Sequence, residues 1–141
     1  MRYALHVRDS SEFNRWERDT IVQNGASTAD IKCMFATSGA YGLVRYNTYD
    51  GLVVKVGDVA WQYQADARGD SVVNCVIVST GGANAFQCDG PAADSLVFVH
   101  NTVATLGGSP ARGVFVQDQS AASHRVVRHN VFYSAATSVR G

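Results

Sequence analysis

Aspartates near the ends of short apolar segments are the residues of this chain whose spacing first indicates chemistry. Asp9, Asp58, Asp89 and Asp118 each follow such a segment at a similar offset. If the segments are stacked strands, equal offsets place these carboxylates in one column, with neighbours about 5 Å apart. That separation suits acid–base or nucleophilic chemistry at a sugar carbon, and also shared Ca²⁺ coordination. We predict Asp89 and Asp118, the best-aligned neighbours, as the catalytic pair.

Each of these aspartates also has a simpler interpretation, because aspartate is a common turn-forming residue at the end of a strand. Side chains suited to bind a polymer are scattered along the chain. Trp61 and Tyr63 alternate with glutamines, which places both rings on one face of a strand. The predicted substrate-binding residues are Asp58, Lys55, Arg112, His129, Trp61 and Tyr63.

The elements that would position these residues are indicated by asparagines that recur at the end of short apolar phrases. These are Asn24, Asn47, Asn74, Asn101 and Asn130, with spacings of 23, 27, 27 and 29 residues (24 to 47, 47 to 74, 74 to 101, 101 to 130). A self-similar period of this length is typical of a solenoid. Asparagine tolerates left-handed backbone angles and bonds neighbouring main chain. We therefore predict that the five asparagines stack as one ladder at a corner of successive coils.

A second set of short segments, rich in β-branched and aromatic residues, alternates with the asparagine phrases. They lie at 4–7, 33–35, 52–56, 85–88 and 113–116. Each coil is therefore predicted to contain at least two strands, joined by turns rich in glycine and serine. Helical periodicity is weak, and residues 10–18 are interpreted as a loop inserted in one coil. The sequence thus predicts an all-β solenoid of about five coils.

The phrases at 96–103, 113–116 and 126–132 resemble the right-handed parallel β-helix family, which includes pectate lyases, polygalacturonases and many phage tailspikes. The resemblance is clearest over residues 72–133. It implies that residues 1–141 form a single β-helix domain, a segment of a longer helix. It also implies an extracellular or cell-surface location and a polysaccharide partner. If the chain is an enzyme, the resemblance implies a polysaccharide lyase or a glycoside hydrolase.

The catalytic signatures of that family are missing from this sequence. Pro110 and Arg112 lack the flanking arginines of the Arg-x-Pro-x-x-Arg pattern of pectate lyases. The Asn-Thr-Asp pattern of polygalacturonases is broken, because Asn101-Thr102 is followed by Val103. There is also no Gly-His-Gly and no adjacent pair of aspartates. These departures put catalysis in doubt, while the fold resemblance stands.

Charge balance, apolar runs and cysteine spacing restrict the classes of partner and site further. The 141 residues carry twelve basic and twelve acidic side chains, so no net field attracts nucleic acid or a membrane surface. No apolar run approaches the roughly 20 residues that span a bilayer, and the first residues lack the apolar core of a secretory signal. Cys33, Cys75 and Cys88 are widely spaced and lack a CxxC pairing, which argues against a zinc or redox site. We interpret them as buried thiols, with one disulfide as the alternative.

Two function classes therefore remain after the sequence alone. In the first, the chain binds a polysaccharide along one lateral face and cleaves it with Asp89 and Asp118. In the second, it is a structural or adhesive β-helix segment without catalysis, of the kind found in tailspikes and cell-surface proteins. Such a segment would form homo-oligomers or adjoin further coils, because solenoid ends expose unpaired strand edges unless they are covered.

Overall fold

The computed structural model describes residues 2–8, 12–22, 31–37, 46–57, 60–64, 68–81, 84–89, 95–106, 114–117 and 124–134. All regular structure within them is β-strand. None of the described residues forms a helix long and apolar enough to cross a membrane.

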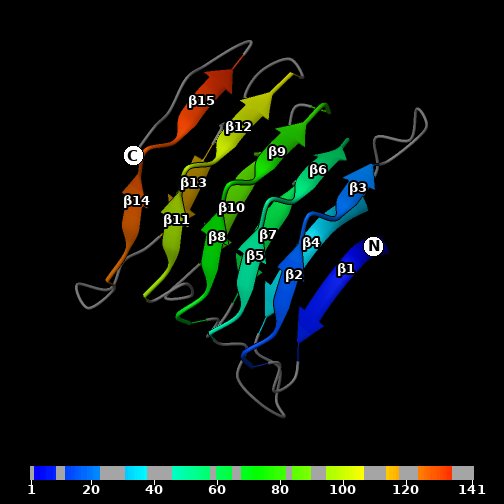
Figure 1. Ribbon diagram of the computed structural model, residues 1–141. Coiled ribbons are helices and arrows are strands. Elements are labelled where there is room, and N and C mark those ends of the chain that lie inside the picture. Colours follow the sequence, from blue (N-terminus) through cyan, green and yellow to red (C-terminus); the bar gives the residue numbers. More distant parts are fainter. Residues whose placement is uncertain are drawn as a thin grey trace.

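Fifteen strands form three parallel sheets of five strands each (Figure 1). The first sheet contains β1 (Arg2–Arg8), β4 (Ile31–Thr37), β7 (Trp61–Gln64), β10 (Phe86–Asp89) and β13 (Val114–Gln117). The second contains β2 (Arg15–Glu17), β5 (Thr48–Asp50), β8 (Ser71–Val73), β11 (Val97–Val99) and β14 (Val126–Arg128). The third contains β3 (Thr20–Val22), β6 (Val53–Val56), β9 (Val76–Ser79), β12 (Thr102–Thr105) and β15 (Val131–Ser134). The chain visits the three sheets in this order five times, and each visit to all three is here named a pass.

The prediction of an all-β fold is confirmed, and its strands are parallel in every sheet, an arrangement compatible with a parallel β-helix. Two details of the predicted organisation are wrong. Residues 10–18 contain β2 where a loop was expected, whereas the prediction of at least two strands in each coil holds, since each pass has three. The segment 52–56 contains β6 of the third sheet, so it does not stack with the segment 85–88, whose strand β10 belongs to the first sheet.

Alternation along the strands explains how the sheets enclose a core. In β6, Val54 and Val56 are buried whereas Val53 and Lys55 are exposed, and β9 and β12 follow a similar pattern. Side chains of period two that point inward from three sheets fill one continuous interior. Its largest members are aromatic and branched aliphatic residues: Trp61, Tyr49, Phe86, Phe98, Leu52 and Ile77.

Aromatic rings connect successive passes inside this core. The Trp16 and Tyr49 rings stack with centroids 5.0 Å apart, and Tyr49 meets Trp61 edge-on at 4.9 Å. Phe86 continues the series, 6.1 Å from Trp61 and 4.4 Å from Phe98. Offset and edge-on pairs of this kind stabilise a core beyond the area they bury. The stack therefore ties four passes together through the interior.

Corners with left-handed backbone lie before and after the second-sheet strand in the first four passes, and the corner after the strand recurs in the fifth. Residues before the strand with positive φ are Phe13, Tyr46, Gly69 and Ser95, and residues after it are Arg18, Gly51, Asn74, His100 and His129. The first group forms what we name the entry corner and the second the exit corner. Five residues separate the two corners in each of the first four passes (13 to 18, 46 to 51, 69 to 74, 95 to 100). The residues that directly follow the corners include the side chains that form hydrogen bonds between passes.

Candidate functional site

The residues that follow the corners form two columns that run along the stack. The entry column contains Asn14, Asn47, Asp70 and Leu96, and the exit column contains Asp19, Leu52, Cys75, Asn101 and Asn130. The carbonyl of a column residue accepts the N–H of the strand in the next pass, as in Thr102 to Cys75 and Val131 to Asn101. Its own N–H requires a different acceptor, and a column side chain supplies it for Asn14, Asn47, Cys75 and Asn101.

Asn101 and Asn130 make the same pair of bonds to the pass before them. The Oδ1 of Asn101 accepts the N–H of Cys75 at 2.8 Å, and its Nδ2 donates to the carbonyl of Val72 at 2.9 Å. The Oδ1 of Asn130 accepts the N–H of Asn101 at 2.8 Å, and its Nδ2 donates to the carbonyl of Phe98 at 2.9 Å. Each asparagine thus satisfies one donor and one acceptor of the buried main chain, groups that are costly to leave unpaired.

Cys75 occupies the same column one pass earlier and partly substitutes for an asparagine. Its Sγ lies 3.1 Å from the carbonyl oxygen of Val73 and 3.6 Å from that of Tyr49. Tyr49 is the counterpart of Val72 and Phe98, the carbonyls that the asparagine amides reach. Burial raises the pKa of the Cys75 thiol to about 11, against a backbone hydrogen bond from Leu52 that lowers it. The thiol is therefore a neutral, buried structural group with weak hydrogen-bonding capacity.

The entry column forms a second ladder in which side chains also contact each other. The Oδ1 of Asn47 accepts from the N–H of Asn14 at 3.0 Å and from its Nδ2 at 3.2 Å. The Oδ1 of Asp70 accepts from the N–H of Asn47 at 2.8 Å and from its Nδ2 at 3.4 Å. Asn47 and Asp70 are both almost fully buried. Leu96 occupies the next position of this column and ends the ladder.

The prediction of one ladder through five asparagines is therefore wrong, although the ladder device itself is present. Asn101 and Asn130 share the exit column, Asn47 belongs to the entry column, and Asn74 is an exposed exit-corner residue with φ 55°. The bonds of the exit column run from side chain to main chain and not from amide to amide. Asn24 lies outside the described residues.

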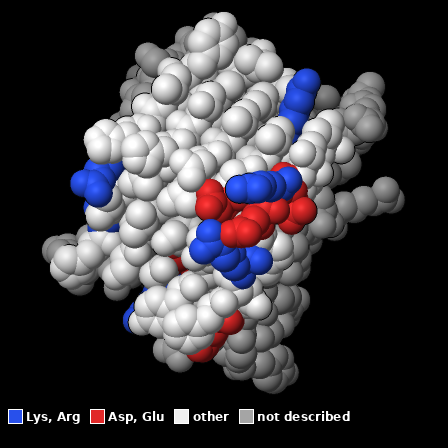
Figure 2. Space-filling model, viewed as in Figure 1, with Lys and Arg blue, Asp and Glu red and all other residues white. Residues whose placement is uncertain are grey.

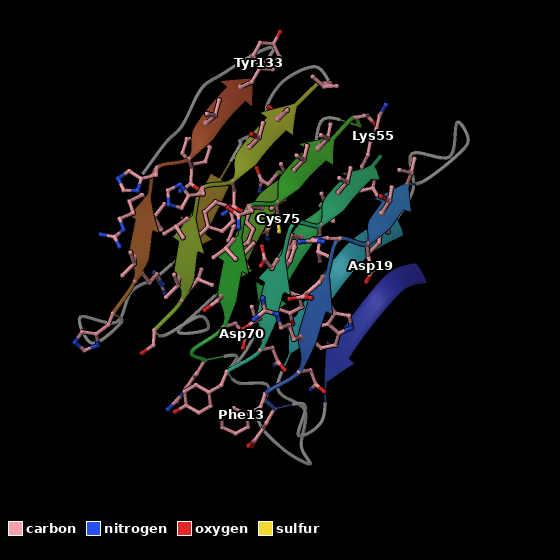
Figure 3. The ribbon with its side chains drawn as sticks, in the orientation of Figure 1. Phe13, Asp19, Lys55, Asp70, Cys75 and Tyr133 are labelled. Atoms are coloured by element: carbon pink, nitrogen blue, oxygen red, sulfur yellow. The ribbon has the colours of Figure 1, made fainter. Side chains whose placement is uncertain are left out.

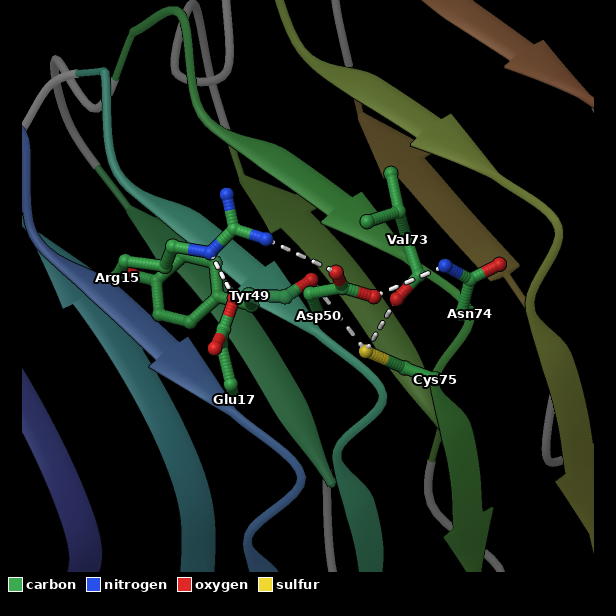
Figure 4. A network of polar contacts seen from close by, with 7 residues as sticks. All are labelled: Arg15, Glu17, Tyr49, Asp50, Val73, Asn74 and Cys75. Carbon is green, nitrogen blue, oxygen red and sulfur yellow. Dashed lines mark hydrogen bonds and ion pairs between the residues drawn. The ribbon is translucent and has the colours of Figure 1, made fainter.

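A network of charged and polar side chains joins three passes on the outer surface of the second sheet, next to the exit corner (Figure 4). The Arg15 guanidinium pairs with Glu17 on its own strand, and its Nη2 lies 3.3 Å from Oδ2 of Asp50 in the next pass. Oδ1 of Asp50 accepts from the Nδ2 of Asn74 at 2.9 Å. Most charged side chains of this face gather in one cluster (Figure 2). The Arg15 side chain is 60% exposed and the Glu17 side chain 50%, so each ion pair contributes little to stability.

The predicted catalytic pair is not brought together in the described part of the chain. Asp89 ends β10, where its register partner in β13 is Gln117 and its side chain is not described. On the other side β10 pairs with β7 as far as Cys88 opposite Tyr63. Asp118 lies outside the described residues, as do Asp9 and Asp58. The segments that precede Asp58 and Asp89 belong to different sheets, since β6 lies in the third sheet and β10 in the first.

The predicted substrate-binding residues are spread over separate surfaces and the core. Trp61 is fully buried between Tyr49 and Phe86, so its prediction as a binding residue is wrong. Lys55 is exposed on the outer face of β6 (Figure 3). His129 is exposed at the exit corner, where its ring lies 5.0 Å from that of His100. Tyr63 lies in β7 with an undescribed side chain, and Arg112 is outside the described residues.

An exposed aromatic pair at the entry corner is the surface feature that sequence reasoning missed. The rings of Phe13 and Tyr46 are stacked, with centroids 5.3 Å apart and an interplanar angle of 18°. Phe13 is 73% exposed and Tyr46 50%. The Tyr46 ring lies against Gly69 of the next pass, where an added Cβ would meet its Cδ1 at 2.5 Å. The signal in the sequence would have been the placement of Phe13 and Tyr46 directly before the two column asparagines, Asn14 and Asn47.

No group of three or more metal-binding side chains occurs among the residues that the structure describes. Comparison with known proteins leaves the family open. No family profile, no curated protein and no solved structure matches this chain significantly.

Proposed function

We propose that this chain is a right-handed parallel β-helix, in which each pass is one coil, and that it acts as a non-catalytic structural module. One observation carries the proposal: both corner columns use their polar side chains to hold consecutive passes together. Buried main-chain groups satisfied in this way at every coil make a stiff rod. Stiffness along an axis is the property that a tailspike or adhesin shaft requires.

The outward face of the third sheet is consistent with such a role. Its exposed or half-buried side chains are mostly small or β-branched, and they include Val53, Val76, Val78, Thr102, Ala104 and Val131. Lys55 is the charged residue in the middle of this face. A face of this composition offers apolar contact surface and few groups for acid–base chemistry.

The proposal is tested by incubating the protein with acidic and neutral polysaccharides. The products are assayed as new reducing ends and as the ultraviolet absorbance of unsaturated sugars. We expect no product with any substrate while the far-ultraviolet circular dichroism reports intact β-structure. Product formed by wild type and lost in Asp89→Asn/Asp118→Asn would overturn the proposal and establish the predicted catalytic pair.

Polysaccharide binding without cleavage is a second candidate, favoured by the exposed Phe13–Tyr46 pair. The apolar C–H faces of sugar rings pack against exposed aromatic rings, whose amphipathic surface suits such contacts. Affinity gel electrophoresis with a polysaccharide panel tests this candidate. We expect Phe13→Ala to lose retardation in the responsive gel. Tyr133→Ala, which removes an exposed aromatic ring at the opposite end of the stack, is the matched control and should bind normally. Equal retardation of both variants would exclude the aromatic pair as the binding site.

A further inference from the structure

The two ends of the stack complement each other. β1, β2 and β3 are the edge strands at one end, and β13, β14 and β15 are the edge strands at the other (Figure 1). Within the described residues each of these strands pairs on one side only. Exposed strand edges of this kind are templates for further pairing.

Burial in the second sheet shows that its inward-facing side chains meet water in the first and the fifth pass. Tyr49, Val72 and Phe98 point inward from the second sheet and are fully buried. Val127 continues the same inward row at one end, yet it is 46% exposed. Trp16 continues it at the other end and is only half-buried. Apolar side chains that face the core but meet water are stabilised when another layer covers them.

We propose that a second copy of this chain covers this open end, so that the fifth pass of one copy stacks on the first pass of the next. The proposal rests on the β-helix architecture proposed above and names the partner of the rod. Extension of the observed register by one pass, about 4.8 Å, defines the facing residues. They are Val127 with Trp16, Arg128 with Glu17, Asn130 with Asp19, Phe132 with Ile21 and Tyr133 with Val22.

Charge favours this partner. Arg128 and Glu17 have opposite signs and occupy the same outward row, so the junction places them directly opposite each other. Opposite charges on directly paired strands stabilise the pairing, and like charges destabilise it.

Apolar side chains match as well. Val127 meets Trp16 and Phe132 meets Ile21 on the inward side of the junction, so the aromatic and aliphatic core continues from one copy to the next. On the outer face, Tyr133 is 57% exposed (Figure 3). Val22 is 44% exposed. Burial of these surfaces supplies the non-directional attraction of the contact.

The exit column also continues across the junction. In this column a side chain accepts the N–H of the column residue one pass earlier, as Asn101 does for Cys75 and Asn130 does for Asn101. Asp19 is the exposed first member of the column and carries acceptor oxygens. Stacking on the fifth pass of another copy places the Asp19 carboxylate at the N–H of Asn130. Such a charge-assisted bond is stronger than the bonds between neutral groups.

The contact is heterologous, because one end of the molecule meets the opposite end of the next, and repetition gives open rods. Sedimentation velocity over a concentration series and negative-stain electron microscopy test it. We expect wild type to form rods that lengthen with concentration at constant width. Glu17→Arg and Arg128→Glu should each weaken self-association about tenfold, because attraction becomes repulsion. Lys55→Glu, a charge reversal on the lateral face of a middle pass, is the control and should assemble like wild type.

An equimolar mixture of the Glu17→Arg and Arg128→Glu proteins should recover assembly. When the two proteins alternate along a rod, every junction again places a positive charge opposite a negative one. The double variant should recover it as well. A wild-type protein that stays monomeric with intact β-structure would overturn the end-to-end contact and leave the structural proposal standing. Assembly insensitive to both end charges, or aggregates that thicken instead of lengthening, would also overturn it. A negligible effect of Asn101→Ala on the free energy of unfolding would instead refute the structural proposal, because that proposal rests on the corner columns holding consecutive passes together.

Discussion

Replacement of Asn101 by alanine tests whether the exit column holds the passes together. Asn101 is 1% exposed, and its side chain makes two bonds, to the N–H of Cys75 and to the carbonyl of Val72. Alanine lacks the amide oxygen and nitrogen that make these bonds. The N–H of Cys75 and the carbonyl of Val72 are then left as one buried donor and one buried acceptor without a partner, at a cost of about 1–3 kcal/mol each. Partial access of water reduces the sum, so we expect Asn101→Ala to lower the free energy of unfolding by about 2–4 kcal/mol.

Urea unfolding followed by circular dichroism and tryptophan fluorescence measures this change. The denaturant slope should stay constant while the midpoint falls. Thermal midpoints should fall by about 2–4 °C for each kcal/mol in a chain of this size. Asn74→Gly is the matched control, because Asn74 is exposed, adopts φ 55° and uses its side chain to bond the Asp50 carboxylate, while its backbone bond to Val99 survives the substitution. Glycine adopts that backbone angle without strain, so this variant should stay within about 0.5 kcal/mol of wild type. Equal effects of the two substitutions, or a negligible effect of Asn101→Ala, would refute the ladder argument.

Three further outcomes follow from the packing. Gly69→Ala should destabilise by about 2–3 kcal/mol in thermal unfolding, because its Cβ would collide with a ring and φ is +65°. Gly51→Ala has φ +67°, but its Cβ would make only ordinary van der Waals contact, 3.5 Å from Cγ of Arg18, so it should lose only about 1 kcal/mol, and equal losses would contradict the collision. Cys75 should resist thiol reagents in the folded protein. Its pKa is raised from 9.0 to about 11 on folding, so its contribution to stability should be complete below pH 9 and lost between pH 9 and 11. Cys75→Ala should lack this loss when unfolding is measured as a function of pH. Trp61→Ala should lower unfolding free energy by about 3–5 kcal/mol and remove blue-shifted fluorescence, whereas an unchanged emission maximum would place the buried signal elsewhere.

The repeat could be recognised in the sequence because each pass must bury similar rows of inward-facing side chains. The asparagines, however, were assigned to the wrong rows of the stack. Asn47 and Asn74 are 27 residues apart, a regular spacing, yet the partner of Asn47 in the next pass is Asp70, four residues before Asn74. Asparagine suits both a left-handed corner and the position after it, so its identity alone does not distinguish the two. The irregular length of the turns concealed the true register.

The candidate site was harder to predict than the fold for a related reason. Alternation of Trp61 with glutamines showed that it shares a face with Tyr63, but alternation does not say which face is inward. Aromatic residues are common in both cores and binding surfaces. Cys75 in the exit column left no sequence signal, because only the three-dimensional register shows that its sulfur lies where asparagine amides lie in later passes.

The constant interval between the two corners determines where this chain tolerates redesign. Five residues separate the corners in every pass from Phe13 to His100, whereas the path from an exit corner to the next entry corner takes 28, 18 and 21 residues (18 to 46, 51 to 69, 74 to 95). A residue added within the short interval would invert which side chains face the core. Peptide epitopes or affinity tags grafted into the long path leave that interval untouched. The molecule thus separates a segment of fixed length, which sets its register, from connections whose length is free to carry new sequence.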